Sequence, residues 1–281
     1  MSYLNVCKIE EYRKYLQEEE KSQSTIDKYI HDIYHFFDFV GINQKMSKEV
    51  VVQYKQSLGE EYKAVSINSM LVAVNGFLEF IGMDDCKVKL HKIQKKIFID
   101  DHKKLTQEEY KRLLKASSQN EKLNMLLQTI CATGIRVSEH KYITVEAVKK
   151  GNATIINKGK VREILIPRIL RQLLLRYCQK SQISAGPIFI TRNKKPINRS
   201  NIWAMMKKLC NDANVDPAKV YPHNLRHLFA FTFYKIEKNL AYLADIMGHS
   251  SIETTRIYTK TSIQECQFTL DKMDLLQKYN Y

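Results

Sequence analysis

Apolar residues recur at helical spacing along most of this chain, and this periodicity constrains the fold more than any other feature. Between residues 9 and 81 they stand three and four positions apart, which places them on one face of a helix. Four such stretches predict four helices, a small all-helical bundle. The apolar positions are Tyr12, Tyr15, Leu16, Ile26, Tyr29, Ile30, Ile33, Phe36, Phe37, Val40, Val65, Leu71, Val74, Phe77, Leu78 and Ile81.

Serine and glycine residues mark the expected ends of these helices. A serine hydroxyl can accept a hydrogen bond from the first helical turn, and glycine adopts the left-handed backbone that often ends a helix. We therefore place a helical domain over residues 1–82. The caps are expected at Ser22 or Ser24, Ser47 and Ser66, and the ends at Gly41, Gly59 and Gly82.

The helical pattern weakens over residues 83–104, where basic and apolar side chains alternate from Lys87 to Lys96. We interpret this stretch as a basic linker. It can lie extended along a phosphate backbone, or it can be a solvated connector with no partner; the sequence leaves both open. In the first case Lys92, Lys95 and Lys96 contact the phosphates.

A second domain is expected over residues 105–281. Thr106 and Glu109 form a capping box that starts a helix, and a later helix over 121–132 stops at Gly134. Arg136 then stands ahead of a short turn over 137–142. Two β-rich runs within 153–166 predict a hairpin with lysines at its tip. Further helices are expected at about 168–180, 200–213, 224–236, 240–247, 252–258 and 262–277, with a second small hairpin from 188–190 and 195–197.

These patterns predict a mainly α fold with a small antiparallel β-sheet. Charge divides the chain in the same place. The 281 residues carry a net charge of +15, yet residues 1–80 hold 9 basic and 12 acidic side chains, and residues 105–281 hold 29 and 14. Such an excess makes a polyanion the expected partner, although charge alone does not separate DNA from RNA or from an anionic membrane.

Several other classes are disfavoured by the composition. No run approaches the roughly 18 apolar residues of a membrane span, and charges in the first 14 residues oppose a signal peptide, so we expect a cytoplasmic protein. The six cysteines show no Cys-x-x-Cys spacing, which argues against a zinc knuckle. No nucleotide-binding Gly-x-x-x-x-Gly-Lys-Ser/Thr motif occurs either. We expect no metal and no cofactor.

The run from Pro222 to His227 carries the strongest chemical signal. His223, Arg226 and His227 share one face of a predicted helix. Spacing alone would allow a zinc site, but the arginine between the two histidines would repel a cation. Hydrogen bonds at a helix start are the plainer structural alternative.

More polar groups follow at helix boundaries. Gly248 ends a predicted helix and delivers His249 at a turn, and Tyr258 lies nine residues further on. With Arg136, Arg226 and the lysines of the hairpin tip, the chain offers cations, imidazoles and a phenol. Cleavage of a phosphodiester without a metal requires such groups: cations for the phosphate oxygens, a proton donor, a base and a nucleophile.

At these residues the chain resembles the tyrosine recombinase (phage integrase) family. Its first arginine box looks like Thr133-Gly134-Ile135-Arg136-Val137-Ser138-Glu139, its His-x-x-Arg-His box matches residues 223–227, and its Gly-His box matches Gly248 through Thr255 to Tyr258. The resemblance covers nearly the whole chain, since residues 8–81 look like the family's helical core-binding domain. It implies a site-specific DNA recombinase that integrates, excises or otherwise recombines double-stranded DNA.

The resemblance also implies residue roles. Tyr258 would attack the phosphate and form a 3′-phosphotyrosyl link, while Arg136 and Arg226 would brace the charge that develops. Lys158 would protonate the leaving oxygen. His223 would assist proton removal from the tyrosine, His249 would bind the phosphate, and Glu139 would orient its neighbours.

Some assignments stay open. The hairpin turn is one residue tighter than the commoner family form, so Lys160 competes with Lys158 as the proton donor. Arg162 is interpreted as a phosphate contact or a structural one. Arg192, Lys194 and Lys195 either contact the DNA backbone or form a solvated basic loop.

The length of the chain leaves no room for the additional arm-binding domain of larger integrases, so we expect a compact, Xer-like or mobile-element enzyme. An apolar stripe near the C terminus would pack on its own domain, or dock on another copy to link four protomers around two DNA duplexes. Two alternatives compete with the recombinase: a catalytically inactive, sequence-specific DNA-binding protein on the same fold, and a relaxing topoisomerase of the related kind.

Overall fold

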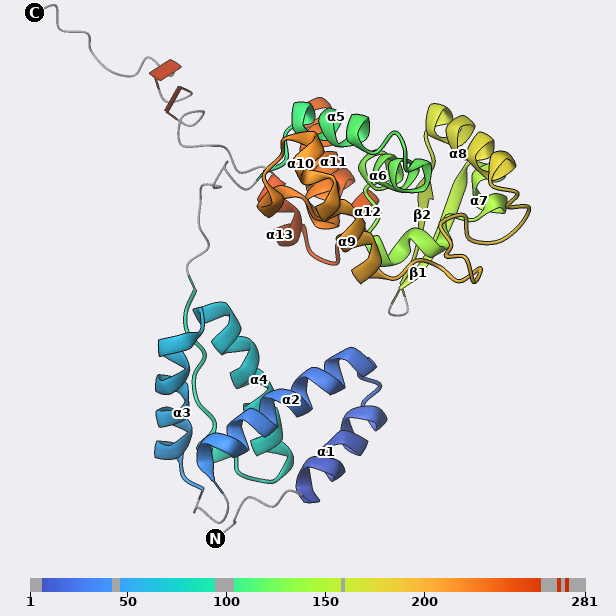
Figure 1. Cartoon of the computed structure of the whole chain (residues 1–281). Helices are drawn as coiled ribbons and strands as arrows, with labels where there is room; N and C mark the ends of the chain where they lie inside the picture. The colour runs from blue at the N-terminus through green and yellow to red at the C-terminus, as the bar shows by residue number, and fades with distance from the viewer. Residues whose placement is uncertain are drawn as a thin grey trace, which may run out of the picture. The chain divides into compact units, whose positions relative to one another are not determined.

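The computed structural model describes residues 7–41, 46–93, 104–157, 160–258, 267–268 and 271–272. The chain forms two compact units, residues 1–95 and 96–281 (Figure 1). Each unit buries its own apolar core, and the predicted fold class is confirmed, because the described elements are helices apart from one two-stranded antiparallel sheet.

The first unit consists of the four helices that the apolar periodicity predicts. Phe36, Tyr54, Leu71 and Phe77 lie fully buried between them. Ser22 and Ser47 stand at the expected cap positions, but neither hydroxyl accepts a capping hydrogen bond, and two other helix ends differ from expectation. The last helix begins before Ser66, because its cap residue is Lys63, and Gly59 lies inside the third helix. The elements are α1 (Cys7–Glu18), α2 (Gln23–Val40), α3 (Lys48–Glu61), α4 (Ala64–Phe80) and the short η1 (Asp84–Cys86).

The chain that follows α4 stays attached to the first unit. The Asn75 side chain donates to the carbonyl oxygen of Val88 and accepts from its N–H, at 2.9 and 3.0 Å. Asn68 binds the main chain of His91 in the same two-way manner. Val88 itself is buried. Residues 87–91 of the expected linker are therefore held along α3 and α4, whereas Lys95 and Lys96 lie outside the described residues.

The second unit is built around α6, which packs between α8 and α11. Leu126, Leu127 and Ile130 on α6 are fully buried. The predicted capping box at Thr106 and Glu109 is confirmed, with both hydrogen bonds present. The elements are α5 (Gln107–Ala116), α6 (Glu121–Thr133), η3 (Val137–Tyr142), α7 (Val145–Lys150), β1 (Asn152–Asn157), β2 (Lys160–Leu165), α8 (Arg168–Lys180), α9 (Arg199–Lys208), α10 (Cys210–Ala213), η4 (Pro217–Lys219), α11 (Pro222–Glu237), α12 (Leu240–Met247), α13 (Ile252–Thr255) and η5 (Arg256–Tyr258).

Two predicted helices are each divided in the structure. The helix expected at 200–213 breaks at Leu209 into α9 and α10, and the one expected at 252–258 becomes α13 followed by the 3₁₀ turn η5. The second small hairpin appears as a tight turn with a single bridge between Ile190 and Pro196. Most of the helix expected at 262–277 lies outside the described residues.

The first predicted hairpin is confirmed as β1 and β2, paired antiparallel with Asn157 opposite Lys160. The tip, residues 158 and 159, lies outside the described residues. Ala153, Ile155 and Ile164 point into the core. Among the helices described, none combines the length and apolar character needed to cross a membrane.

Candidate active site

The first arginine enters the site where α6 ends. Gly134 adopts a left-handed backbone with φ of 65° directly after this helix, and it turns the chain toward Arg136. Arg136 caps η3, and its Nη1 donates to Glu139 Oε1 at 2.9 Å. Its Nη2 lies 3.3 Å from the carbonyl oxygen of Gly248. The chain segments around residues 136 and 248 therefore meet at the Arg136 guanidinium.

The second arginine lies inside the protein. Arg226, on α11, is only 1% exposed. Its guanidinium donates to the carbonyl oxygens of Gly134 and Met247, the latter at 2.6 Å, and its Nη2 lies 3.2 Å from His249 Nε2. Burial lowers the pKa of Arg226 to about 10, so it remains charged at neutral pH. The main chain therefore holds this cation rigidly under the site.

His249 is held as a neutral imidazole. Its Nδ1 lies 2.8 Å from Thr255 Oγ1, and Thr255 is completely buried. Because Arg226 can only donate, His249 Nε2 accepts, and the ring proton sits on Nδ1 and points to Thr255. Burial and the charges of Arg226, Arg136 and Arg162 lower the pKa of His249 to about 4.

Tyr258 lies in η5, packed against the histidines. Its ring centroid is 5.1 Å from that of His227, edge to face, and 6.3 Å from that of His249, nearly parallel. Burial raises the pKa of Tyr258, while the positive charges of Arg226 and Arg136 and a hydrogen bond with Arg226 act to lower it. These arginines would stabilise the phenolate in preference to the phenol.

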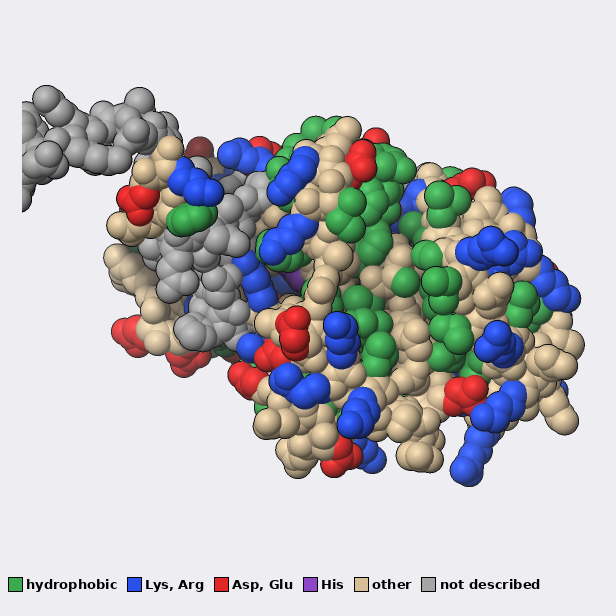
Figure 2. Space-filling view, turned by 90° about the horizontal axis from the view of Figure 1, so that it is seen from above, with side chains coloured by type: hydrophobic (Ala, Val, Ile, Leu, Met, Phe, Trp, Pro, Cys, Tyr) green, Lys and Arg blue, Asp and Glu red, His purple; other side chains and the backbone are tan. Residues whose placement is uncertain are grey.

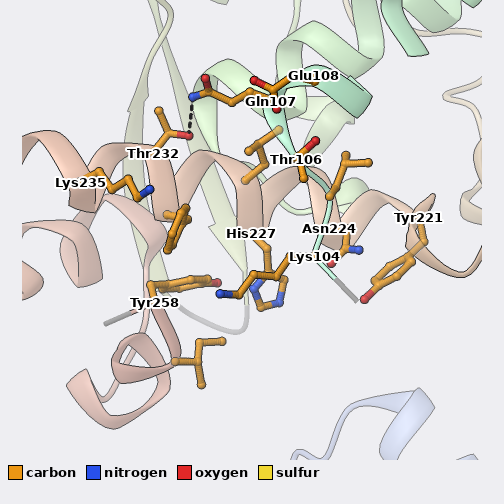
Figure 3. A pocket seen from close by; sticks show the side chains of 14 residues that line it. Lys104, Thr106, Gln107, Glu108, Tyr221, Asn224, His227, Thr232, Lys235 and Tyr258 are labelled. Atoms are coloured by element: carbon orange, nitrogen blue, oxygen red, sulfur yellow. Dashed lines mark hydrogen bonds between the residues drawn. The ribbon is translucent and has the colours of Figure 1, made fainter. Parts of the chain in front are cut away.

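Tyr258 and His227 line one cavity of about 560 Å³, and Figure 3 shows the two side chains next to each other in it. The cavity opens between the start of α5 and the face of α11. Lys104 and Lys235 also line it, and the ammonium groups of both lie over the ring of Phe231. Glu108 lines the cavity too, so Tyr258 faces a recess that carries two ammonium groups and one carboxylate.

Most of the residues singled out in the sequence meet here. Arg136, Arg226, His249 and Tyr258 come together from four segments of the chain. His223 lies at the exposed edge, with its ring 4.5 Å from that of His227. Although the His223 side chain is exposed at one edge, partial burial of its ring and the positive charges of Arg226, Arg136 and Arg199 lower its pKa. Lys158 lies outside the described residues, and for Lys160 the structure describes the main chain.

Two further residues, to which the sequence gives no catalytic role, also belong to the site. His227 stands between His223 and Tyr258, and burial lowers its pKa to about 4. Its position four residues after His223 was the available signal. The sequence allows Arg162 to be a phosphate contact or a structural one; in the structure its side chain is only 14% exposed and donates to Glu139 Oε2 at 2.6 Å.

The candidate DNA-contacting residues are more scattered. Lys92 is exposed on the first unit, and Arg192, Lys194 and Lys195 are exposed on the loop before α9. Figure 2 shows Lys and Arg side chains spread widely over one face of the molecule, with a histidine visible in a hollow among them. Within the described ranges, no three His, Cys, Asp or Glu side chains are grouped to hold a metal ion.

Comparison with known proteins agrees with this geometry. Residues 103–265 match the phage integrase family, and residues 9–82 match its N-terminal SAM-like domain. The tyrosine recombinase XerA of Thermococcus kodakarensis is 27% identical over 96% of either chain, and the tyrosine recombinase XerD of Halalkalibacterium halodurans is 27% identical over 85% of this chain and 87% of its own.

Solved structures share the fold at lower identity. A lambda integrase dimer bound to a core site superposes with a TM-score of 0.74 at 15% identity, over 99% of each chain. The integrase of transposon Tn1549, in complex with transposon right-end DNA, gives 0.72 at 16% identity, over 97% of this chain and 100% of the other. Since the family match spans more than half of its residues, this chain belongs to the phage integrase family, the tyrosine-type site-specific DNA recombinases.

Proposed function

We propose that this protein cleaves and rejoins double-stranded DNA at a specific site through a covalent link to Tyr258. One observation carries the proposal: a tyrosine near the end of the described catalytic unit lies against a buried, main-chain-anchored arginine and two neutral histidines. A tyrosine serving only as core would need no such surroundings.

The proposed step is a transesterification. The Tyr258 oxygen bonds to phosphorus, the bond from phosphorus to the 5′-oxygen breaks, and a 3′-phosphotyrosyl link and a 5′-hydroxyl result. Because one ester replaces another, the bond energy is kept and rejoining reverses the step. Arg136 and Arg226 neutralise the charge on the phosphorane, which forked guanidinium donors do well.

Proton transfer is assigned to the remaining groups. We propose that Lys158 protonates the leaving 5′-oxygen, with Lys160 as its competitor. His223 assists removal of the phenol proton. The His227 ring contacts both the His223 ring and the Tyr258 ring and so lies between them. His249 can donate to the phosphate in its other tautomer, in which the proton is on Nε2, Thr255 Oγ1 donates to Nδ1 and the contact with Arg226 is given up.

The family match supports the role of the first domain, whose residues 1–80 carry more acidic than basic side chains, and charge supports the role of the second. We propose that residues 1–82 bind DNA, that residues 83–104 link the domains, and that residues 105–281, with their excess of basic side chains, form the catalytic domain that grips the phosphates. We further propose a homotetramer that joins two DNA sites through C-terminal segments, acting in the cytoplasm as a compact Xer-like or mobile-element recombinase.

The test is a covalent trap. DNA is first selected from a random duplex pool by binding to Tyr258→Phe, and the selected duplex is then nicked so that the cleaved strand end diffuses away. The native protein should accumulate a covalent adduct and Tyr258→Phe should form none. Tyr242→Phe is the matched control, since Tyr242 lies on α12, 47% exposed. An adduct that persists in Tyr258→Phe contradicts the assignment.

Binding by Tyr258→Phe should depend steeply on salt. Release of counterions from about 6 to 10 phosphates lowers affinity by roughly 10³ to 10⁵ between 50 and 200 mM salt. Titration of labelled duplex across this range measures the slope, and a flat response would exclude a phosphate clamp.

A further inference from the structure

Arg162 occupies a position where a strand normally carries an apolar side chain. It pairs with Ile155 across the hairpin, and the next inward residue on the same strand is Ile164; both isoleucines are buried. Val161, which precedes it, points outward and is 66% exposed. An arginine that faces inward requires partners for its charge and its donors.

Those partners come from two other catalytic segments. Arg162 Nη2 donates to Glu139 Oε2 at 2.6 Å, and Nη1 donates to the carbonyl oxygen of Ile246 at 3.2 Å. Glu139 is 2% exposed, and its other oxygen accepts from Arg136. A single buried carboxylate is therefore shared between the arginine of β2 and the arginine that we propose for the phosphate.

The turn before His249 is shaped around the same guanidinium. A Cβ added to Gly248 would lie 2.4 Å from Arg162 Nη1 and 2.6 Å from its Cδ. Gly248 also has φ of 61°, which disfavours any other residue. Because Gly248 has no side chain, Arg162 can fill the space beside it. The hydrogen bond that Arg162 donates to the Ile246 carbonyl holds the end of α12.

We propose that Arg162 is a positioning residue. Through Glu139 and the Ile246 carbonyl it holds β2, Arg136 and the turn before His249 in a fixed arrangement. This inference rests on the proposed function. Without Arg162, the buried carboxylate of Glu139 would have Arg136 as its remaining arginine partner and would pull it more strongly away from a phosphate. The end of α12 would also lose a donor.

The test measures cleavage at saturating protein separately from affinity, on the nicked duplex selected above. Arg162→Gln should slow adduct formation by roughly 10- to 100-fold, as is typical when a partner of an active group is lost, with the dissociation constant within about twofold of native. Arg162→Lys, which keeps a charge but not the planar fork, should cleave at an intermediate rate. Arg176→Gln, on the exposed side of α8, is the control and should behave as native.

A double-mutant cycle with Glu139→Gln identifies the route. If Arg162 acts through Glu139, the slowing caused by Arg162→Gln shrinks in the Glu139→Gln background. Fully additive effects, or a native cleavage rate in Arg162→Gln, would overturn the inference. A third pattern would also overturn it: either variant at position 162 binds DNA more weakly, with a smaller salt slope, but cleaves at the native rate at saturation. That pattern is expected of a residue that contacts a phosphate.

The two proposals fail in different ways. A native protein that forms no Tyr258-dependent adduct refutes the proposed function, and the inference falls with it. A native adduct combined with any of the overturning patterns refutes the role of Arg162 alone. Should Arg162→Gln not fold, Arg162→Lys carries the same comparison of rate against affinity.

Discussion

Replacing Gly134 by alanine should destabilise the second unit strongly, although it adds one methyl group. Gly134 ends α6 with φ of 65°, and an added Cβ would lie 2.4 and 2.5 Å from two ring carbons of Phe229 on α11. The left-handed backbone costs a non-glycine residue about 1–2 kcal/mol. Displacing a packed ring costs roughly 1–3 kcal/mol more. The expected loss of unfolding free energy is therefore roughly 2–5 kcal/mol.

Gly186→Ala isolates the backbone contribution. Gly186 has φ of 72°, and an added Cβ would meet nothing within 4 Å. Only the backbone cost of about 1–2 kcal/mol is expected there. The single tryptophan of the chain, Trp203 on α9, reports unfolding of this unit by fluorescence in urea.

The decisive comparison adds the Phe229→Ala background to the variants Gly134→Ala and Gly186→Ala. In the Phe229→Ala background the clash is absent, so Gly134→Ala should then cost no more than Gly186→Ala. Cleavage should also fall in Gly134→Ala, because the Gly134 carbonyl anchors Arg226. Equal destabilisation by Gly134→Ala and Gly186→Ala in otherwise native protein would refute the steric reasoning.

Two other outcomes are expected. Arg226→Lys should abolish adduct formation and lower the unfolding free energy by roughly 2–4 kcal/mol, because a compact ammonium cannot reach Gly134, Met247 and His249 as the separate Nη1 and Nη2 of the guanidinium do. Native stability by Trp203 fluorescence would contradict this. The unfolding free energy should fall as the pH drops from about 6.5 to about 4. In the folded protein His227 and His249 have a pKa of about 4, below the ordinary value of about 6.5, so in this range the unfolded state binds more protons than the folded state. Urea unfolding at pH 7 and pH 5 measures this change in unfolding free energy. The fall should be smaller in the double variant His227→Asn, His249→Asn. An equal fall in that variant would show that these two imidazoles are not the source of the pH dependence.

Much of the local structure was predictable because it depends on residues a few positions apart. The capping box at Thr106, the end of α6 at Gly134 and the hairpin over 152–165 each follow from contacts within one turn or one strand pair. Prediction failed where such signals are weak. α3 continues through Gly59, although a glycine inside a helix costs about 1 kcal/mol relative to alanine, and the helix expected through Leu209 divides there.

The tertiary structure decided how distant segments meet. Helical periodicity puts His223 and His227 on one face of α11, but only the packing of η5 against that face brings the His227 ring into contact with the Tyr258 ring. A strand pattern likewise cannot show that Arg162 reaches Glu139 and Ile246.

By itself the sequence determined the helical class, the hairpin and the set of side chains available for phosphate chemistry, because spacing along the chain controls which residues share a turn or a strand. Which of those side chains touch, and which are buried and shifted in pKa, was decided by the packing of α11, α12 and η5. Those contacts join residues about 20 to 110 positions apart, and no local pattern encodes such a distance.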